Sequence, residues 1–166
     1  NAVTAFLPLY LSEAAGLATS TANLLYSLVF AVTVVQLVTG DLSDRVGRFP
    51  VMVGTLGLAA AALVALVSLP GLGAGAVAAA AVVALFGLGS HGFQPVRSAY
   101  LMELLPERLA GGGLGVVRTL LMGAGALAPS AVGIVADAVG FRPAFALRAG
   151  SMGLAAVVAA GLWLAE

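Results

Sequence analysis

Long apolar segments constrain this fold more than any other feature of the sequence. Four of them hold few or no charges and cover residues 51–69, 74–93, 114–135 and 143–164, and a fifth, 24–39, is slightly shorter. A helix needs roughly 20 apolar residues to cross the hydrocarbon layer of a membrane. The segments approach or reach that length, so they predict membrane-spanning helices.

The composition supports a chain whose surface faces lipid. Hydrophobic residues make up 61% of the sequence and charged residues only 8%, whereas a soluble domain carries about 25% charged residues. Strands of a membrane barrel would be short and alternating in polarity, and an open sheet cannot satisfy its backbone in lipid. We therefore expect an all-α, polytopic membrane bundle with the lipid bilayer as its surroundings.

Several function classes are not expected for such a sequence. It has no cysteine, which excludes disulfides and thiolate metal sites, and no basic run that would bind nucleic acid. Ser90 stands beside the only histidine, His91, but neighbours on a helix point about 100° apart and do not form a nucleophile–base pair. We expect no enzyme activity, no cofactor and no metal.

Breaks rich in glycine, proline and charge divide the chain into six expected helices. Their ranges are 2–11, 21–39, 50–69, 74–105, 110–138 and 143–165. The first would reach only roughly 15 Å, about half the hydrocarbon thickness, so we expect it to be the second half of a helix that begins upstream. Pro50 and Pro143 suit the first turn of a helix, where the missing N–H would have no partner.

A pattern of two glycines, an aspartate and a proline occurs twice with identical spacing. Its copies are Gly40, Asp44, Gly47 and Pro50, and Gly133, Asp137, Gly140 and Pro143. The copies are offset by three expected helices, so they would lie on opposite faces of the membrane. Transporter halves have this arrangement of inverted repeats. We therefore expect one six-helix unit made of two inverted triplets, 1–73 and 74–166.

The stretch 40–48, with the sequence GDLSDRVGR, is the most informative in the chain. It resembles the G-x-L-x-D-R-x-G-R signature between the second and third helices of each half in the major facilitator superfamily, although Phe49 replaces a further basic residue. Residues 6–11 resemble the end of the seventh helix of such transporters, and 136–140 with Phe145 resemble the junction of their last two. These likenesses favour the C-terminal six-helix half.

The resemblance implies secondary active transport of a small-molecule substrate by alternating access. Substrate would bind near mid-membrane between two six-helix halves, so the missing N-terminal half is an expected partner. A non-transporting scaffold or receptor of the same fold is the alternative function. Substrate, direction and coupling ion do not follow from these residues.

Three residues of this stretch have physical roles that do not depend on the family. Gly40 would let the second helix approach a neighbouring backbone closely. Asp44 would accept hydrogen bonds from free N–H groups at a helix N-terminus and lie in its positive field. Gly47 would adopt a positive φ in a tight turn.

Two arginines would place fixed charges at the membrane surface. In the fold that the resemblance implies, Arg45 and Arg48 would pair with Glu103 and Glu107, which end the fourth helix. Pairs that form in one conformation and break in another would act as a latch. The simpler alternative is an anchor that only fixes topology.

The distribution of arginine predicts the orientation. Arg45, Arg48 and Arg108 fall on one expected face and Arg142 on the other. The positive-inside rule therefore places residues 40–50 in the cytoplasm. All seven cations are arginine, which we interpret as a GC-rich or halophilic source. We expect the plasma membrane of a prokaryote.

Polar residues within the spans are candidates for function. His91 and Gln94 share one face of the fourth helix and would either line a central cavity or hydrogen-bond between helices. Arg118, about two turns into the fifth helix, would either pair with Glu103 or attract an anion into the cavity. Asn23 and Tyr26 share a face of the second helix that we expect to lie in the bundle interior, where hydrogen bonds between helices would explain them.

Overall fold

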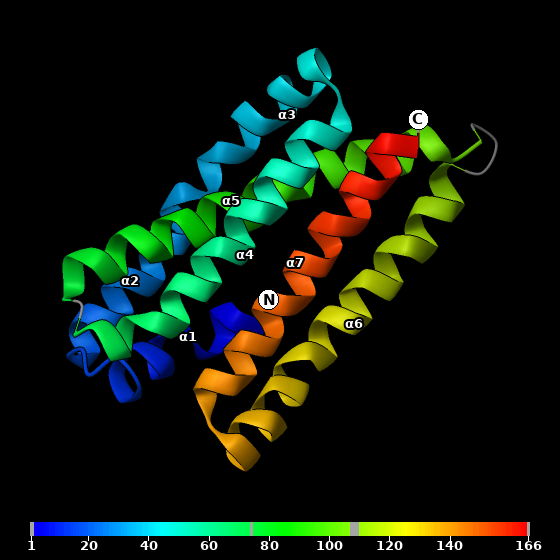
Figure 1. The fold of residues 1–166 in the computed structure, drawn as a ribbon. Helices are drawn as coiled ribbons and strands as arrows, with labels where there is room; N and C mark the ends of the chain where they lie inside the picture. Colours follow the sequence, from blue (N-terminus) through cyan, green and yellow to red (C-terminus); the bar gives the residue numbers. More distant parts are fainter. Residues whose placement is uncertain (1, 74, 107–109, 166) are drawn as a thin grey trace.

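The computed structural model in Figure 1 is a bundle of long helices, and it describes residues 2–73, 75–106 and 110–165. The elements in order are α1 (Ala2–Glu13), α2 (Thr19–Ala31), the 3-10 turn η1 (Val32–Val34), α3 (Val35–Val46), α4 (Arg48–Leu72), α5 (Ala76–Leu104), α6 (Ala110–Val139) and α7 (Phe141–Ala165). The described residues contain no strand. The all-α prediction is confirmed.

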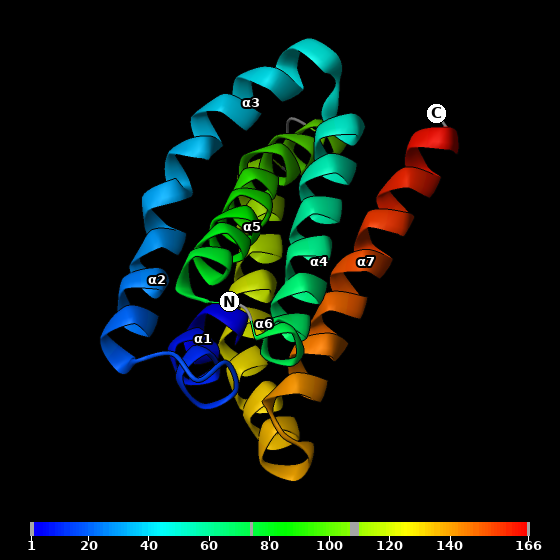
Figure 2. The same cartoon turned by 60° about the vertical axis from the view of Figure 1, so that its left-hand side comes forward.

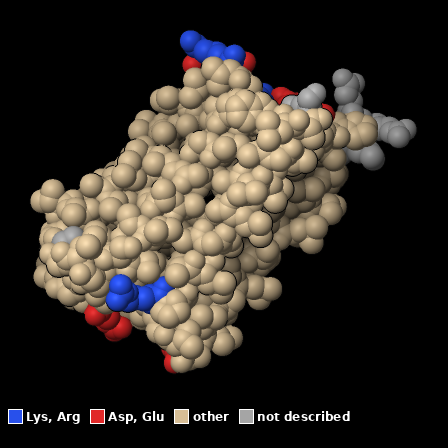
Figure 3. Space-filling model, viewed as in Figure 1, with Lys and Arg blue, Asp and Glu red and all other residues tan. Residues whose placement is uncertain are grey.

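Five helices in the described residues are long and apolar enough to cross a membrane. One of them, Thr19–Val46, runs through α2, η1 and α3. Large apolar side chains are exposed along these helices, among them Leu37, Val77 and Leu164. On the face drawn in Figure 3, the visible charged side chains lie toward the two ends of the molecule, with a broad uncharged band between them. The chain is an integral membrane protein.

The buried core joins both expected triplets. Its larger cluster draws residues from α1, α2, α4, α5 and α7, and a smaller one lies between α4 and α5. Neither cluster contains a residue of α6, which packs against α7 and α1. Figure 2 shows the α2–α3 helix at one edge of this view and α7 at the other. Among the described residues, helices from both expected triplets therefore share one core.

The break between the second and third long helices is shorter than the sequence predicted. Residues 40–46 are helical, and only Gly47 separates α3 from α4, with φ of 97°. Salt bridges four residues apart, such as Arg45–Asp41 at 2.9 Å, support the helical end of α3. The expected loop 40–50 is therefore wrong in extent, but the positive φ expected at Gly47 is confirmed.

The second copy of the repeated pattern makes the same kind of turn. Gly140 alone separates α6 from α7, with φ of 90°. The N–H of Gly140 donates to the carbonyl of Ala136 at 2.8 Å, just as that of Gly47 donates to Ser43 at 3.1 Å. Helix α7 thus begins two residues before Pro143, which stays in its first turn. Figure 1 shows the α3–α4 and α6–α7 turns at opposite ends of the bundle.

The end of α4 differs from the turn predicted at 70–73, because α4 continues to Leu72. Proline has no N–H, so Pro70 deprives the carbonyl of Leu66 of its helical donor. The buried hydroxyl of Tyr10 replaces that donor at 3.0 Å. The guanidinium of Arg142 also donates to the carbonyl of Val67, at 3.2 and 3.3 Å. These bonds tie α1 and α7 to the end of α4.

Close backbone approach occurs on α5, and the prediction that it involves Gly40 is wrong. A Cβ added to Gly89 would lie 2.6 Å from the backbone nitrogen of Ala59 on α4, and one added to Gly87 would meet a side chain of η1 at 2.5 Å. At Gly40 the nearest atom would be at 4.0 Å, which is ordinary contact. The sequence signal that we missed is the pair of glycines two residues apart, beside the polar centre of α5.

Candidate functional site

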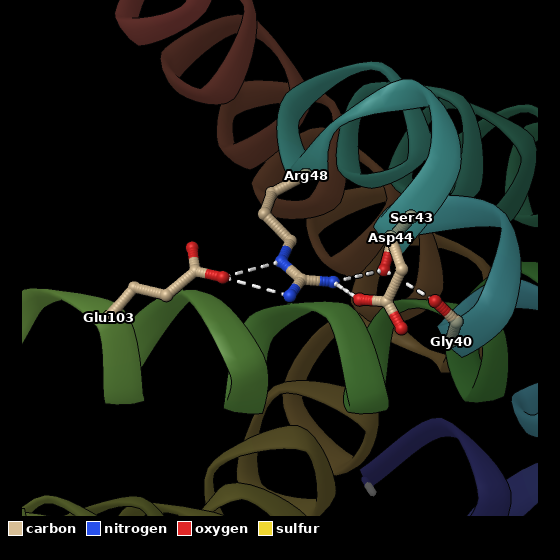
Figure 4. Close-up of polar contacts among 5 residues, drawn as sticks. All are labelled: Gly40, Ser43, Asp44, Arg48 and Glu103. Atoms are coloured by element: carbon tan, nitrogen blue, oxygen red, sulfur yellow. Dashed lines mark hydrogen bonds and ion pairs between the residues drawn. The ribbon is translucent and has the colours of Figure 1, made fainter.

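One arginine joins three helices at the α3–α4 turn (Figure 4). Its Nε and Nη2 atoms both donate to Oε1 of Glu103 on α5, at 3.0 and 2.8 Å. Nη1 of Arg48 donates to Oγ of Ser43 at 2.8 Å and also to Oδ1 of Asp44. We call Arg48, Ser43, Asp44 and Glu103 the Arg48 network.

The helix ends explain why these charges associate. Arg48 is the first residue of α4, where the helix dipole disfavours a cation. Glu103 lies in the last turn of α5 and Asp44 in that of α3, where the dipole disfavours an anion. Each charge interacts unfavourably with the dipole of its own helix, and pairing between the arginine and the two carboxylates offsets that cost for all three.

Burial differs sharply across the Arg48 network. The side chain of Arg48 is 21% exposed, whereas those of Asp44 and Glu103 are 64% and 53% exposed. Ser43 is buried, and its hydroxyl donates to the carbonyl of Gly40 at 2.8 Å, which orients it to accept from Arg48. The guanidinium is therefore held in place, while both carboxylates remain open to water.

The network corrects part of the sequence prediction. The expected pair Arg48–Glu103 is present, but Arg45 pairs with Asp41 along its own helix instead of with Glu103. Asp44 accepts from Arg48, and no side chain caps the start of α4, so the predicted capping role is wrong. Glu107 lies outside the described residues.

Sequence reasoning missed Ser43. The residue occupies a variable position of the signature, so the motif gave no reason to select it. A usable signal was its spacing, three residues after Gly40 and five before Arg48, which suits a small hydroxyl facing the helix end.

A second polar group lies near the middle of α5. The amide Nε2 of Gln94 is 3.1 Å from Nδ1 of His91, within the same helix. The imidazole faces the Phe30 ring of α2 at 6.4 Å between centroids, and Tyr26 meets Phe30 edge-on at 5.1 Å. In the described residues His91 has no hydrogen bond to another helix, so that alternative is wrong.

The polar face of α2 lies outside the packed core. Asn23 is exposed and Tyr26 is half-buried. Ser27 donates to the carbonyl of Asn23 in its own helix, at 3.2 Å. The buried contacts of α2 use Ala22, Leu25 and Val29 instead. The predicted place of Asn23 and Tyr26 in the bundle interior is therefore wrong.

The remaining candidate, Arg118, is exposed on α6. It makes no ion pair with Glu103, whose carboxylate contacts Arg48, so the expected structural pair is wrong. The described residues hold no group of three or more side chains that could ligate a metal.

The element order, the two glycine turns and the Arg48 network agree with one family. A family model described as Major Facilitator Superfamily matches residues 1–166. This chain belongs to the major facilitator superfamily. Membership implies a membrane transporter in general, from a family that is not generally enzymatic. Comparison with curated proteins and with solved structures gives no match.

Proposed function

We propose that this facilitator carries a small solute across the membrane by alternating access, as one six-helix half that works with a second half. The two similar turns at Gly47 and Gly140, at opposite ends of the bundle, support two inverted triplets. The sparse burial of α6, the least buried spanning helix, supports a further partner surface. Polar side chains exposed near mid-span would need this partner surface to shield them from lipid.

The Arg48 network carries this proposal, because it links the ends of three helices that must shift when one face opens. Exposed ion pairs contribute only about 0.2–1 kcal/mol each. A network of that strength stabilises one state without locking it, since about 1.4 kcal/mol changes a population tenfold. Arg48 and Arg45 favour the cytoplasmic face for this end, so the network would hold the inner face closed.

The solute would meet the polar face formed by α2 and α5. His91, Gln94, Tyr26 and Asn23 stand on this face, and His91 lies near the centre of a helix that spans Ala76–Leu104. Substrate sites of secondary transporters lie at this depth.

Two-sided labelling tests alternating access without knowledge of the substrate. The chain has no cysteine, so Ser98→Cys, exposed one turn beyond Gln94, introduces a unique thiol. In a full-length background without other cysteines, we expect a sulfonated, impermeant maleimide to label it from either side of the membrane. Labelling from one side only would favour the scaffold or receptor and overturn the proposal.

The same thiol tests the latch. Adding Glu103→Gln should raise inner-side labelling of Ser98→Cys by up to about fivefold and lower outer-side labelling, because losing up to about 1 kcal/mol shifts the population by that factor. Asp41→Asn is the matched control, since it removes a carboxylate from the exposed Arg45–Asp41 pair in the last turns of α3, beside the Arg48 network. Equal effects of the two variants would contradict a latch at Arg48.

A further inference from the structure

One ring nitrogen of His91 faces the side-chain amide of Gln94. The Nε2 atom of this amide is 3.1 Å from Nδ1 of His91, and because an amide NH₂ group can only donate, this orientation of the amide assigns Nδ1 as the acceptor. The proton of a neutral imidazole then resides on Nε2 of the ring. This Nε2–H has no hydrogen-bond partner in the described part of the chain. The Nε2–H group of His91 is therefore a hydrogen-bond donor without an acceptor among these residues.

Two aromatic rings from α2 stand beside this donor. Phe30 is 48% exposed, and its ring centroid is 6.4 Å from that of His91. Tyr26 meets Phe30 edge-on, with an angle of 73° between the rings. With a neutral imidazole, His91, Phe30 and Tyr26 are all uncharged. Their rings therefore suit an uncharged, ring-shaped ligand.

Backbone hydrogen bonding changes in both helices next to this group. The 3-10 turn η1 follows Phe30 almost directly, and Pro95 follows Gln94. Because proline lacks an N–H, the carbonyl of His91 loses its helical donor. Irregular turns within helices often mark functional hinges. The donor and the rings thus stand beside the 3-10 turn that follows α2 and beside the backbone hydrogen bond that Pro95 removes from α5.

We propose that His91, Gln94, Tyr26 and Phe30 form a subsite for an uncharged aromatic solute that carries a hydrogen-bond acceptor. The acceptor binds Nε2–H of His91, and the aromatic part of the solute packs against Phe30 and Tyr26. Gln94 is a positioning residue that fixes the tautomer. The inference rests on the proposed function and names the substrate class of its site.

The single histidine gives a direct spectroscopic test. We would record ¹⁵N-histidine NMR spectra of the protein in lipid nanodiscs and assign the signal with His91→Gln. The expected ring signals are a protonated Nε2 and an unprotonated Nδ1. Gln94→Leu should give a mixture of tautomers. A wild-type ring protonated on Nδ1 would overturn the proposal.

Three probes then test the ligand class. Acetophenone, a neutral aromatic ketone, should shift the Nε2 signal saturably. Cyclohexyl methyl ketone, which lacks the aromatic ring, should bind at least about fivefold more weakly, the scale of an aromatic contact. Benzoate keeps the ring, but it should also bind more weakly because its charged carboxylate would lose water at an uncharged site. Equal or tighter binding of either control, or no saturable shift by acetophenone, would contradict the proposed class.

Variants locate the aromatic contact. Phe30→Leu should weaken acetophenone binding about fivefold, whereas the matched control Phe93→Leu, on the α5 face that contacts Arg97, should leave it unchanged. Equal effects would place the ligand elsewhere and overturn the subsite. Binding is read without transport, so a failure of this site and a failure of alternating access at Ser98→Cys are separate results.

Discussion

At the scale of single residues, the contacts between helices are explained by charges that oppose a helix dipole and by a carbonyl that has lost its helical donor. Arg48 begins a helix and Glu103 ends one, so each opposes the dipole of its own helix until the two pair. Leu66 loses its helical donor to Pro70 until Tyr10 supplies another. Each local penalty is relieved by a contact between helices, which makes these contacts specific.

A double-mutant cycle should detect the Arg48–Glu103 contact. Arg48→Gln and Glu103→Gln should show a coupling of about 1 kcal/mol in the free energy of unfolding, because they share one network and Arg48 is only 21% exposed. The Arg45→Gln and Asp41→Asn cycle should give about 0.5 kcal/mol or less, since both side chains are more than 60% exposed. Denaturation in mixed micelles would measure both cycles, and equal couplings would contradict the assigned network.

The Tyr10 hydroxyl should stabilise the fold only where Pro70 is present. Tyr10→Phe leaves the buried carbonyl of Leu66 without a partner, and we expect a loss of about 1–3 kcal/mol in the free energy of unfolding. In a Pro70→Ala background the helix supplies its own N–H, so the same change should have a smaller effect. Tyr26→Phe is the control. A Tyr10→Phe effect that is independent of residue 70 would refute this account.

At the scale of elements, packing in this bundle depends on where two backbones meet. Helix α5 lies against α4 through Gly89 and against η1 through Gly87, with no room for a side chain at either position. Small residues permit such contacts between helices in lipid, where the hydrophobic effect does not drive association. The position of α5, and with it His91 and Glu103, depends on these glycines.

A matched pair of alanine substitutions tests this packing. Gly89→Ala should lower the free energy of unfolding by about 1–3 kcal/mol, because the new Cβ would overlap the α4 backbone. Gly150→Ala, with nothing within 4 Å of the added Cβ, should be neutral or stabilise α7 by up to about 1 kcal/mol. Thermal unfolding in detergent measures both, and a stabilising Gly89→Ala would rule out the close contact.

The sequence determines the helices well and their contacts poorly. Apolar length and a positive φ at Gly47 are local properties, so the spans and this turn were predictable. The helical end of α3 was missed because the Asp41–Arg45 salt bridge favours helix over the expected loop. Ser43 and Tyr10 were missed because their partners depend on which faces meet, and the Arg48–Glu103 pair was foreseen through the resemblance.

At the scale of the whole molecule, the proposed transporter needs its two glycine turns on opposite sides of the membrane. Val46 and Val139 each directly precede one of these turns, and both are exposed. An odd number of spanning helices, α4, α5 and α6, separates them. The latch, the orientation and the solute face all depend on this arrangement.

The most direct test is the side of the membrane from which each turn is labelled in intact cells. We expect an impermeant maleimide to label Val139→Cys at once, and Val46→Cys only after the membrane is opened. Labelling of both from the same side, or of Val46→Cys in intact cells, would contradict the inverted bundle with its Arg48 network on the cytoplasmic face.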